Sequence, residues 1–88
     1  MKAGFRKSFL KDAKTLHSKK LKERIKSTIR DVEKAENLQS IGNLKKLKGS
    51  EKYYRIRIGD YRIGIIVEGQ MVTFVRCLHR REIYRYIP

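Results

Sequence analysis

The chain has 88 residues, and 23 Lys and Arg against nine Asp and Glu give it a formal net charge of +14. This excess attracts phosphate polymers before any specific contact forms, so nucleic acid is the expected partner, although acidic membranes or an acidic protein would also suit it. The length allows one domain, residues 1–88, with a modest core, and no apolar run approaches the ~20 residues that cross a bilayer.

Cysteine and histidine usage excludes two further classes. Cys77 is the only cysteine, so no internal disulfide can form, and the apolar residues around it favour a packed strand thiol over a nucleophile. One Cys and two His without ligand spacing do not make a zinc site, so no metal is expected. Residues 1–6 lack the apolar segment of a secretory signal, which favours a cytoplasmic protein.

The first half of the chain carries helical periodicity after a short N-terminal strand, which is expected at residues 1–5 and at the edge of a sheet. Ser8 is expected to cap a first helix, and Ser18 a second helix that runs to about Glu36. Apolar residues recur every three to four positions in both helices. They are Phe9, Leu10, Ala13 and Leu16 in the first, and Leu21, Ile25, Ile29 and Val32 in the second.

The second half is typical of strands. Residues 37–50 form a connection with apolar anchors, and a two-residue turn at Gly59-Asp60 joins the first pair of strands. The strands are expected at 53–58, 61–67 and 71–79. Two helices that cover the apolar face of this three-stranded meander give an α+β fold. The expected sheet is antiparallel and includes the short N-terminal strand.

The predicted hairpin places arginines on one face. Side chains alternate along a strand, so Arg55 and Arg57 share the face opposite the isoleucines between them. The two-residue turn sets Arg57 opposite Arg62 and Arg55 opposite Gly64. Like charges opposite each other destabilise a sheet, which indicates a use for the cluster, and planar guanidinium groups suit phosphate oxygens. A solvated face that carries arginine by chance stays as the alternative.

A second polar cluster follows the third strand. Because this strand should pair with the second, its C-terminal end lies beside Arg62 and the turn, so His79, Arg80 and Tyr84 are expected to reach the same site. Whether Arg76 joins them depends on the register of the last hairpin, since a slip of one residue exchanges the two faces. The sequence leaves that register open.

Four segments carry a resemblance over nearly the whole chain. They are Phe5-x-x-Ser8-Phe9-x-Lys11-Asp12, Leu44-x-x-Leu47-Lys48-Gly49, the hairpin from Tyr54 to Ile63, and His79-Arg80-Arg81-Glu82-Ile83-Tyr84. In this order and spacing the chain resembles the RelE/ParE superfamily of bacterial toxins, and most of all its RelE branch. The resemblance implies the small RelE-like fold, an endoribonuclease that cleaves mRNA in the ribosomal A site, and a co-expressed antitoxin that neutralises it.

The resemblance also implies a role for each matching residue, in a reaction without metal or cofactor. A ribose 2′-hydroxyl attacks the adjacent phosphorus and expels the 5′-oxygen of the next nucleotide. Tyr84 matches the base, Arg62 the residue that stabilises the phosphoryl charge, and Arg80 the residue that assists the leaving group. Tyr86 and His79 are the two alternatives to Tyr84 as the base. The implied substrate contacts are Arg55, Arg57, Lys48, His79 and Arg81.

Two other functions stay open. Members of the ParE branch poison DNA gyrase without cutting RNA, although they generally lack the convergent arginines and the terminal tyrosine. A non-catalytic RNA-binding module would use the same hairpin. An acidic antitoxin is expected to contact the helix surfaces and the apolar residues Ile83, Tyr86 and Ile87. The alternative is that these three residues only close the core of the toxin.

Overall fold

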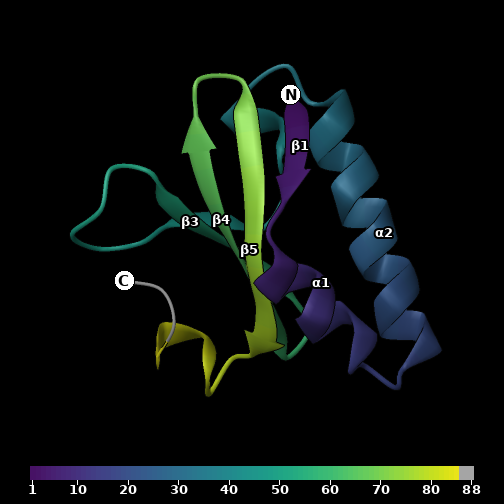
Figure 1. Ribbon diagram of the computed structural model, residues 1–88. Helices are drawn as coiled ribbons and strands as arrows, with labels where there is room; N and C mark the ends of the chain where they lie inside the picture. The colour runs from purple at the N-terminus through teal and green to yellow at the C-terminus, as the bar shows by residue number, and fades with distance from the viewer. Residues whose placement is uncertain (86–88) are drawn as a thin grey trace.

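Two helices cover one face of a five-stranded sheet in the computed structural model, which describes residues 1–85 (Figure 1). The strands are β1 (Lys2–Phe5), β2 (Leu44–Lys46), β3 (Tyr53–Ile58), β4 (Tyr61–Glu68) and β5 (Met71–His79). The helices are α1 (Lys7–Lys14) and α2 (Lys19–Lys34), and two 3₁₀ turns are η1 (Leu38–Ser40) and η2 (Ile83–Arg85). The expected α+β fold is confirmed. No helix within residues 1–85 is long and apolar enough to span a membrane.

The sheet has the order β1-β5-β4-β3-β2. β1 lies at an edge as expected, but it runs parallel to β5, so the sheet is mixed and the expectation of a wholly antiparallel sheet is wrong in this detail. β2 pairs with β3 inside the segment that was expected to be a connection. Strands of three or four residues hold too few side chains for alternation to reveal them or their direction, so tertiary contacts decide both.

The two predicted helix caps have different outcomes. Ser18 caps α2 as expected, because its Oγ accepts a hydrogen bond from the backbone N–H of Leu21 at 3.1 Å. The expectation that Ser8 caps α1 is wrong. Ser8 lies inside the helix, which begins at Lys7, and its Oγ donates to the carbonyl of Val75 at 2.6 Å. The Ser8 hydroxyl, which the sequence predicts at the helix end, instead donates to a backbone carbonyl of the sheet.

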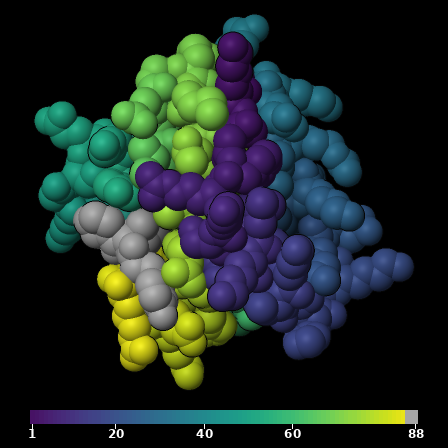
Figure 2. All heavy atoms as spheres, viewed as in Figure 1, coloured from purple at the N-terminus to yellow at the C-terminus, as the bar shows by residue number. Residues whose placement is uncertain are grey.

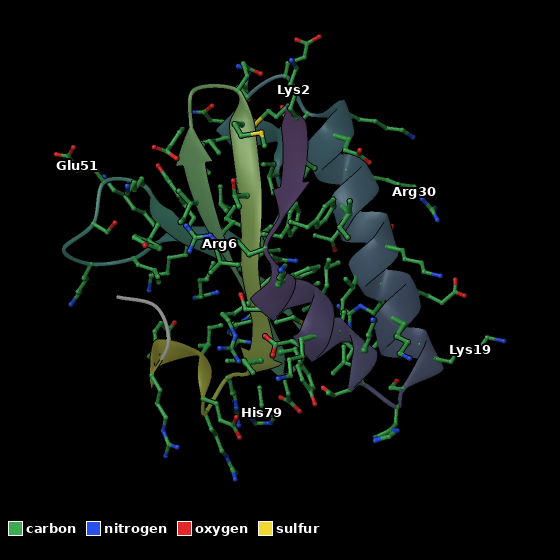
Figure 3. All side chains as sticks on the ribbon, viewed as in Figure 1. Lys2, Arg6, Lys19, Arg30, Glu51 and His79 are labelled. Carbon is green, nitrogen blue, oxygen red and sulfur yellow. The ribbon has the colours of Figure 1, made fainter. Side chains whose placement is uncertain are left out.

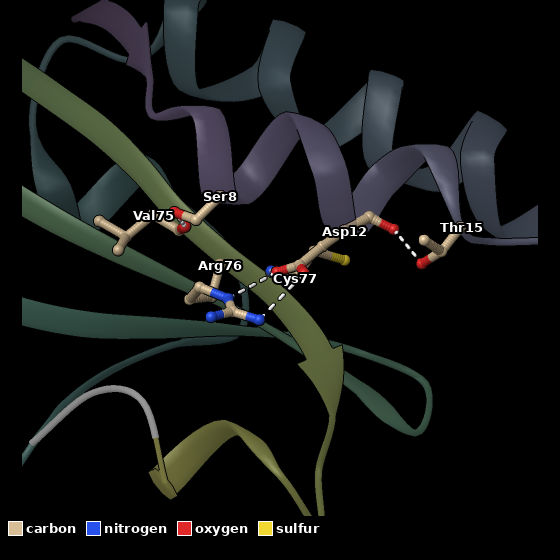
Figure 4. Close-up of polar contacts among 6 residues, drawn as sticks. All are labelled: Ser8, Asp12, Thr15, Val75, Arg76 and Cys77. Carbon is tan, nitrogen blue, oxygen red and sulfur yellow. Dashed lines mark hydrogen bonds and ion pairs between the residues drawn. The ribbon is translucent and has the colours of Figure 1, made fainter.

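Side chains of α1 complete the edge of β5. β1 pairs with β5 only as far as Phe74, so the following backbone groups of β5 have no strand neighbour on that side. Ser8 binds the carbonyl of Val75, and Asp12, one helical turn later, accepts from the N–H of Cys77 at 2.9 Å (Figure 4). A buried backbone group left without a partner costs ~1–3 kcal/mol. The Ser8 and Asp12 spacing therefore fixes α1 to the sheet.

The main core lies between the helices and the sheet. Its most deeply buried members are Val32, Ile63, Ile65, Val72 and Phe74. Cys77 also belongs to this core, as expected for a packed thiol. Burial raises the pKa of the Cys77 thiol to about 12, and the nearby Asp12 carboxylate adds to the shift.

The β3–β4 register is the one expected from the two-residue turn: Arg57 lies opposite Arg62, and Arg55 opposite Gly64. Between β4 and β5 the register shifts just after Gly64, which lies opposite Arg76. This irregularity decides the register that the sequence left open, because it puts Arg76 on the same face as Arg55. We call this face of the sheet, opposite the helices, the open face.

Candidate functional site

Basic side chains cross the open face in two neighbouring rows. Arg57 and Arg62 form one row on β3 and β4. In the next row Lys45 of β2 lies opposite Arg55, and Arg76 lies in the same row on β5. Lys45 was not expected in this row, because the alternation of a three-residue strand is too short to recognise in the sequence. Like charges in such positions repel each other, so the fold keeps the cluster at some loss of stability.

Arg55 and Arg76 differ in how their guanidinium groups are satisfied. Arg76 is held by Asp12, with Nε donating to Oδ2 at 2.8 Å and Nη2 donating to Oδ1 at 3.0 Å. Arg55 is half-buried, and its Nε is buried without a hydrogen-bond partner in the described part of the chain. An unsatisfied charged donor is costly, so the fold keeps Arg55 at this position at some loss of stability.

Arg62 lies at the centre of the positive charge. Its Nη1 donates to the carbonyls of Gly59 at 2.9 Å and Tyr61 at 3.0 Å, which folds the side chain onto the β3–β4 turn. Burial lowers the pKa of Arg62, the charges of Arg55, Arg57 and Arg80 lower it further, and the Tyr84 phenol opposes them. The guanidinium stays charged at any ordinary pH. The lowered pKa therefore reflects burial first and the neighbouring positive charges second, and a bound anion would relieve only the second.

A hollow of about 440 Å³ opens beside this turn. It is lined by Arg24, Asn43, Arg57, Gly59, Asp60, Arg62 and Arg80. The backbone N–H of Arg80 donates to the carbonyl of Asp60 at 2.8 Å, which holds the segment after β5 against the turn. Arg80 and Arg62 therefore line the same hollow, which is where the sequence placed both of them.

Two residues of the hollow, Arg24 and Asn43, were not expected there. Helical periodicity assigned Arg24 to the polar surface of α2, and it shows only which side of a helix is apolar. It does not show which polar residue meets a hairpin turn that is distant in the sequence. Asn43 has a positive φ of 58° and its carbonyl accepts from the N–H of Arg57 at 3.1 Å, so β3 is anchored to the loop before β2. No signal in the spacing of residues marks either position.

Tyr84 lies in η2 and is 56% exposed. The neighbouring Ile83 is fully buried, and it packs with Leu47, Tyr53 and Leu78 in a small apolar cluster separate from the main core. This anchor holds η2 against the sheet and leaves the Tyr84 phenol in solvent, close enough to Arg62 to affect its pKa. Ile83 is already buried in the toxin without an antitoxin, which agrees with the alternative that this residue closes the core and makes no antitoxin contact.

The expectation that His79 reaches the arginine cluster is wrong. Leu78 lies opposite Arg62, so the pleat turns the next side chain to the other face of the sheet. There the His79 ring packs edge-on against Tyr61, with ring centroids 5.6 Å apart. Its Nδ1 accepts from the backbone N–H of Arg81 at 3.2 Å. His79 is thus directed away from Arg62.

The remaining residues that the sequence predicted for the site do not line the hollow beside the turn or lie outside the described residues. Lys48 and Arg81 are both exposed, and neither lines the hollow beside the turn. Tyr86, the substitute base, and Ile87, an expected antitoxin contact, lie outside the described residues. Within residues 1–85 no group of three or more His, Cys, Asp or Glu is arranged to hold a metal ion. The groups that converge are guanidinium groups and one phenol, which suit a phosphodiester.

Comparisons with known proteins identify the family. A family described as "ParE toxin of type II toxin-antitoxin system, parDE" matches residues 4–84. The chain is 44% identical to "Toxin RelE3" of Methanocaldococcus jannaschii, and the alignment covers 100% of both proteins.

Solved structures agree with this assignment. The RelB-RelE antitoxin-toxin complex of Methanococcus jannaschii contains a chain that is 42% identical, with a TM-score of 0.81 over 97% of this chain and 99% of that chain. A chain of the archaeal RelE-RelB complex of Pyrococcus horikoshii OT3 is 22% identical and shares the fold, with a TM-score of 0.73 over 90% and 93% of the two chains. The open-face arginines, the turn beside them and these matches lead to one conclusion: the chain belongs to the RelE/ParE superfamily of type II toxin–antitoxin toxins, in its RelE-like branch.

Proposed function

We propose that this toxin is an endoribonuclease that cleaves mRNA in the ribosomal A site without a metal. The observation that carries the proposal is the position of Arg62, which lies among Arg55, Arg57 and Arg80 and close to the Tyr84 phenol. A site of this kind binds a phosphodiester through several guanidinium groups and offers an oxygen that can exchange a proton. The family of the chain and its similarity to RelE toxins support the same activity.

The proposed reaction is a transesterification in which each group has one task. Tyr84 removes the proton of a ribose 2′-hydroxyl, whose oxygen attacks the adjacent phosphorus and displaces the 5′-oxygen of the next nucleotide. Arg62 stabilises the negative charge that grows on the phosphoryl oxygens. Arg80 donates a hydrogen bond to the departing 5′-oxygen, which takes up a proton from solvent and leaves as a 5′-hydroxyl. The other fragment ends in a 2′,3′-cyclic phosphate.

Substrate binding is assigned to Arg55 and Arg57. Both lie on the open face of β3, with Arg57 directly opposite Arg62, and planar guanidinium groups suit phosphate oxygens. Lys45, opposite Arg55, adds a further positive charge along the same row. These basic side chains of β2 and β3 thus offer contacts for the RNA backbone beside the reacting phosphate.

Primer extension on cellular transcripts after a short induction tests the activity. Cuts inside codons support the ribonuclease, and purified protein with RNA in the presence and absence of ribosomes shows whether the ribosome is required. Intact transcripts together with arrested growth contradict the proposal.

The description of the matching family favours a second candidate, a ParE-like poison of DNA gyrase. The same induction experiment separates the two. Gyrase poisoning gives DNA damage and intact transcripts, whereas ribonuclease action gives cut transcripts without early DNA damage. A non-catalytic RNA-binding module gives neither.

The cognate antitoxin is the proposed protein partner, and the chain resembles the toxin in solved RelB-RelE complexes. A groove of about 490 Å³ runs between α1 and α2, which lie side by side in Figure 2 (purple and blue). Its apolar floor is Phe5, Phe9, Leu10, Ala13, Ile25 and Ile29, and its rim carries Lys14, Lys22 and Lys26. An acidic amphipathic segment of the antitoxin matches this surface, because it would cover the apolar floor and pair with the lysines.

A further inference from the structure

The hollow beside the β3–β4 turn is wider than the proposed reaction requires, because it extends beyond the sheet to α2. Three of its arginines, Arg57, Arg62 and Arg80, come from the sheet and the segment that follows it. The fourth, Arg24, comes from the middle of α2. Nothing in the proposed chemistry uses Arg24.

The Arg24 guanidinium lies close to the turn. Gly59 has a positive φ of 58°, and a Cβ added to it would lie 3.3 Å from Nη1 of Arg24. A glycine at this position therefore serves the turn and also leaves room for the guanidinium beside the turn backbone. Arg24 is exposed to solvent, so its other donors are open to a ligand.

Charge in the hollow is strongly unbalanced. Four guanidinium groups line it against a single carboxylate, that of Asp60. No carboxylate oxygen within residues 1–85 lies within 4.0 Å of a guanidinium nitrogen of Arg24, Arg57 or Arg80. Four side chains that would repel one another are thus held together with one carboxylate in the hollow and with no close ion pair for Arg24, Arg57 or Arg80, an excess of positive charge that suits an anion.

We infer that the RNA backbone continues from the open face around the turn, and that Arg24 binds the phosphate adjacent to the one that reacts. Arg57 and Arg62 belong both to the row on the open face and to the hollow, so the two surfaces are continuous. Arg24 is a binding residue at the far end of this path. Its task is to hold the strand in register, so that the 2′-hydroxyl is presented to the reacting phosphorus. This inference rests on the proposed function for the identity of the ligand as RNA.

The test compares two variants of the same helix by RNA binding. Arg24→Gln removes the proposed contact, and Arg30→Gln removes the same charge from the outer side of α2, where Arg30 points away from the sheet (Figure 3). The probe is a short fluorescein-labelled single-stranded RNA with 2′-methoxy groups, which cannot be cleaved. Fluorescence anisotropy at several salt concentrations gives Kd and its salt dependence, and circular dichroism shows that both variants are folded.

Arg24→Gln is expected to weaken binding about tenfold, as for the loss of one charge-assisted hydrogen bond. The plot of the logarithm of the association constant against the logarithm of the salt concentration has a negative slope. Its magnitude is expected to decrease by about 0.7, the value for one phosphate of a single strand. Arg30→Gln should change Kd much less. Equal effects of the two variants overturn the inference, because they would show that only total charge matters.

Probes with one neutral methylphosphonate locate the phosphate. For the wild-type protein, neutralising the phosphate that Arg24 contacts should weaken binding about tenfold, and for Arg24→Gln the same probe should bind like its parent. The inference is overturned if, at every position of the methylphosphonate, its effect on affinity adds to that of Arg24→Gln. It is also overturned if the wild-type protein does not bind RNA. If the wild-type protein shows this coupling but does not cut RNA, the proposed function alone is overturned. If it cuts RNA but shows no coupling, the inference about Arg24 alone is overturned.

Discussion

Asp12 of α1 and Arg76 of β5 form a two-pronged ion pair, with nitrogen–oxygen distances of 2.8 and 3.0 Å, and the same carboxylate accepts the backbone N–H of Cys77 at 2.9 Å. One side chain therefore closes the exposed edge of β5 and also fixes an arginine at the border of the candidate site. Both partners are largely buried, with side-chain exposures of 12% for Asp12 and 21% for Arg76.

Asp12→Ala should be among the most destabilising single substitutions at a polar residue. It leaves the Cys77 N–H and the Arg76 guanidinium without their acceptor, at a cost of about 2–3 kcal/mol. For a chain of this size the thermal midpoint should fall by about 10 °C or more. Calorimetry measures this, with Glu23→Ala on the exposed side of α2 as the control. Equal midpoints for the two variants would show that the edge contact contributes little.

Arg62→Ala combined with Arg80→Ala should abolish toxicity and leave the fold intact. The two side chains add to a cluster of like charges, so their removal should not lower the thermal midpoint. Growth after induction and primer extension measure the activity, and circular dichroism checks the fold. Full growth arrest by the folded double variant would remove both arginines from the mechanism.

Tyr84→Phe should reduce cleavage by about 100-fold or more, which is the usual effect of losing a general base. His79→Gln is the matched comparison, because His79 packs on Tyr61 on the far side of the sheet from Arg62. It should retain cleavage close to that of the wild type. Single-turnover rates on ribosome-bound mRNA distinguish the two variants. Loss of cleavage in His79→Gln with Tyr84→Phe active would reverse the assignment of the base.

Leu10→Gln should weaken binding of the cognate antitoxin about three- to tenfold without unfolding the chain. Leu10 is 48% exposed and lines the groove between α1 and α2, so a bound segment would bury its exposed half, which contributes about 0.7–1.5 kcal/mol. Met71→Gln makes the same kind of change at an exposed residue of β5 that does not line the groove. Calorimetric titration with the antitoxin compares them, and equal affinities would place the antitoxin elsewhere.

Cys77 should resist iodoacetamide at pH 8 in the folded protein and react readily in urea. The reactive form is the thiolate, and burial raises the pKa of Cys77 from 9.0 to about 12. Because the folded pKa is the higher one, the associated stability is complete below pH 9 and is lost as the pH rises toward 12. Cys77→Ala should show a smaller loss of stability over this range. Rapid labelling without denaturant would contradict the buried position.

Local rules were enough to predict the hairpin and its arginines. A two-residue turn and strand alternation determine which side chains lie opposite each other over a few residues, and β3, β4 and β5 have nearly the predicted bounds. The two helices followed from apolar periodicity, and the burial of Cys77 followed from its apolar neighbours in the sequence.

Contacts between distant segments decided the rest. The register shift after Gly64 determines that Arg76 shares a face with Arg55, and it depends on packing across two strands. The pleat at the end of β5 turns His79 away from Arg62, and the packing of α2 on the sheet brings Arg24 to Gly59. Ser8 binds the sheet edge and not its own helix end, because β1 stops too early to satisfy β5. Alternation and periodicity describe one element at a time, so the sequence by itself determined the hairpin and the pairing of its arginines, and the tertiary structure decided which other residues surround them.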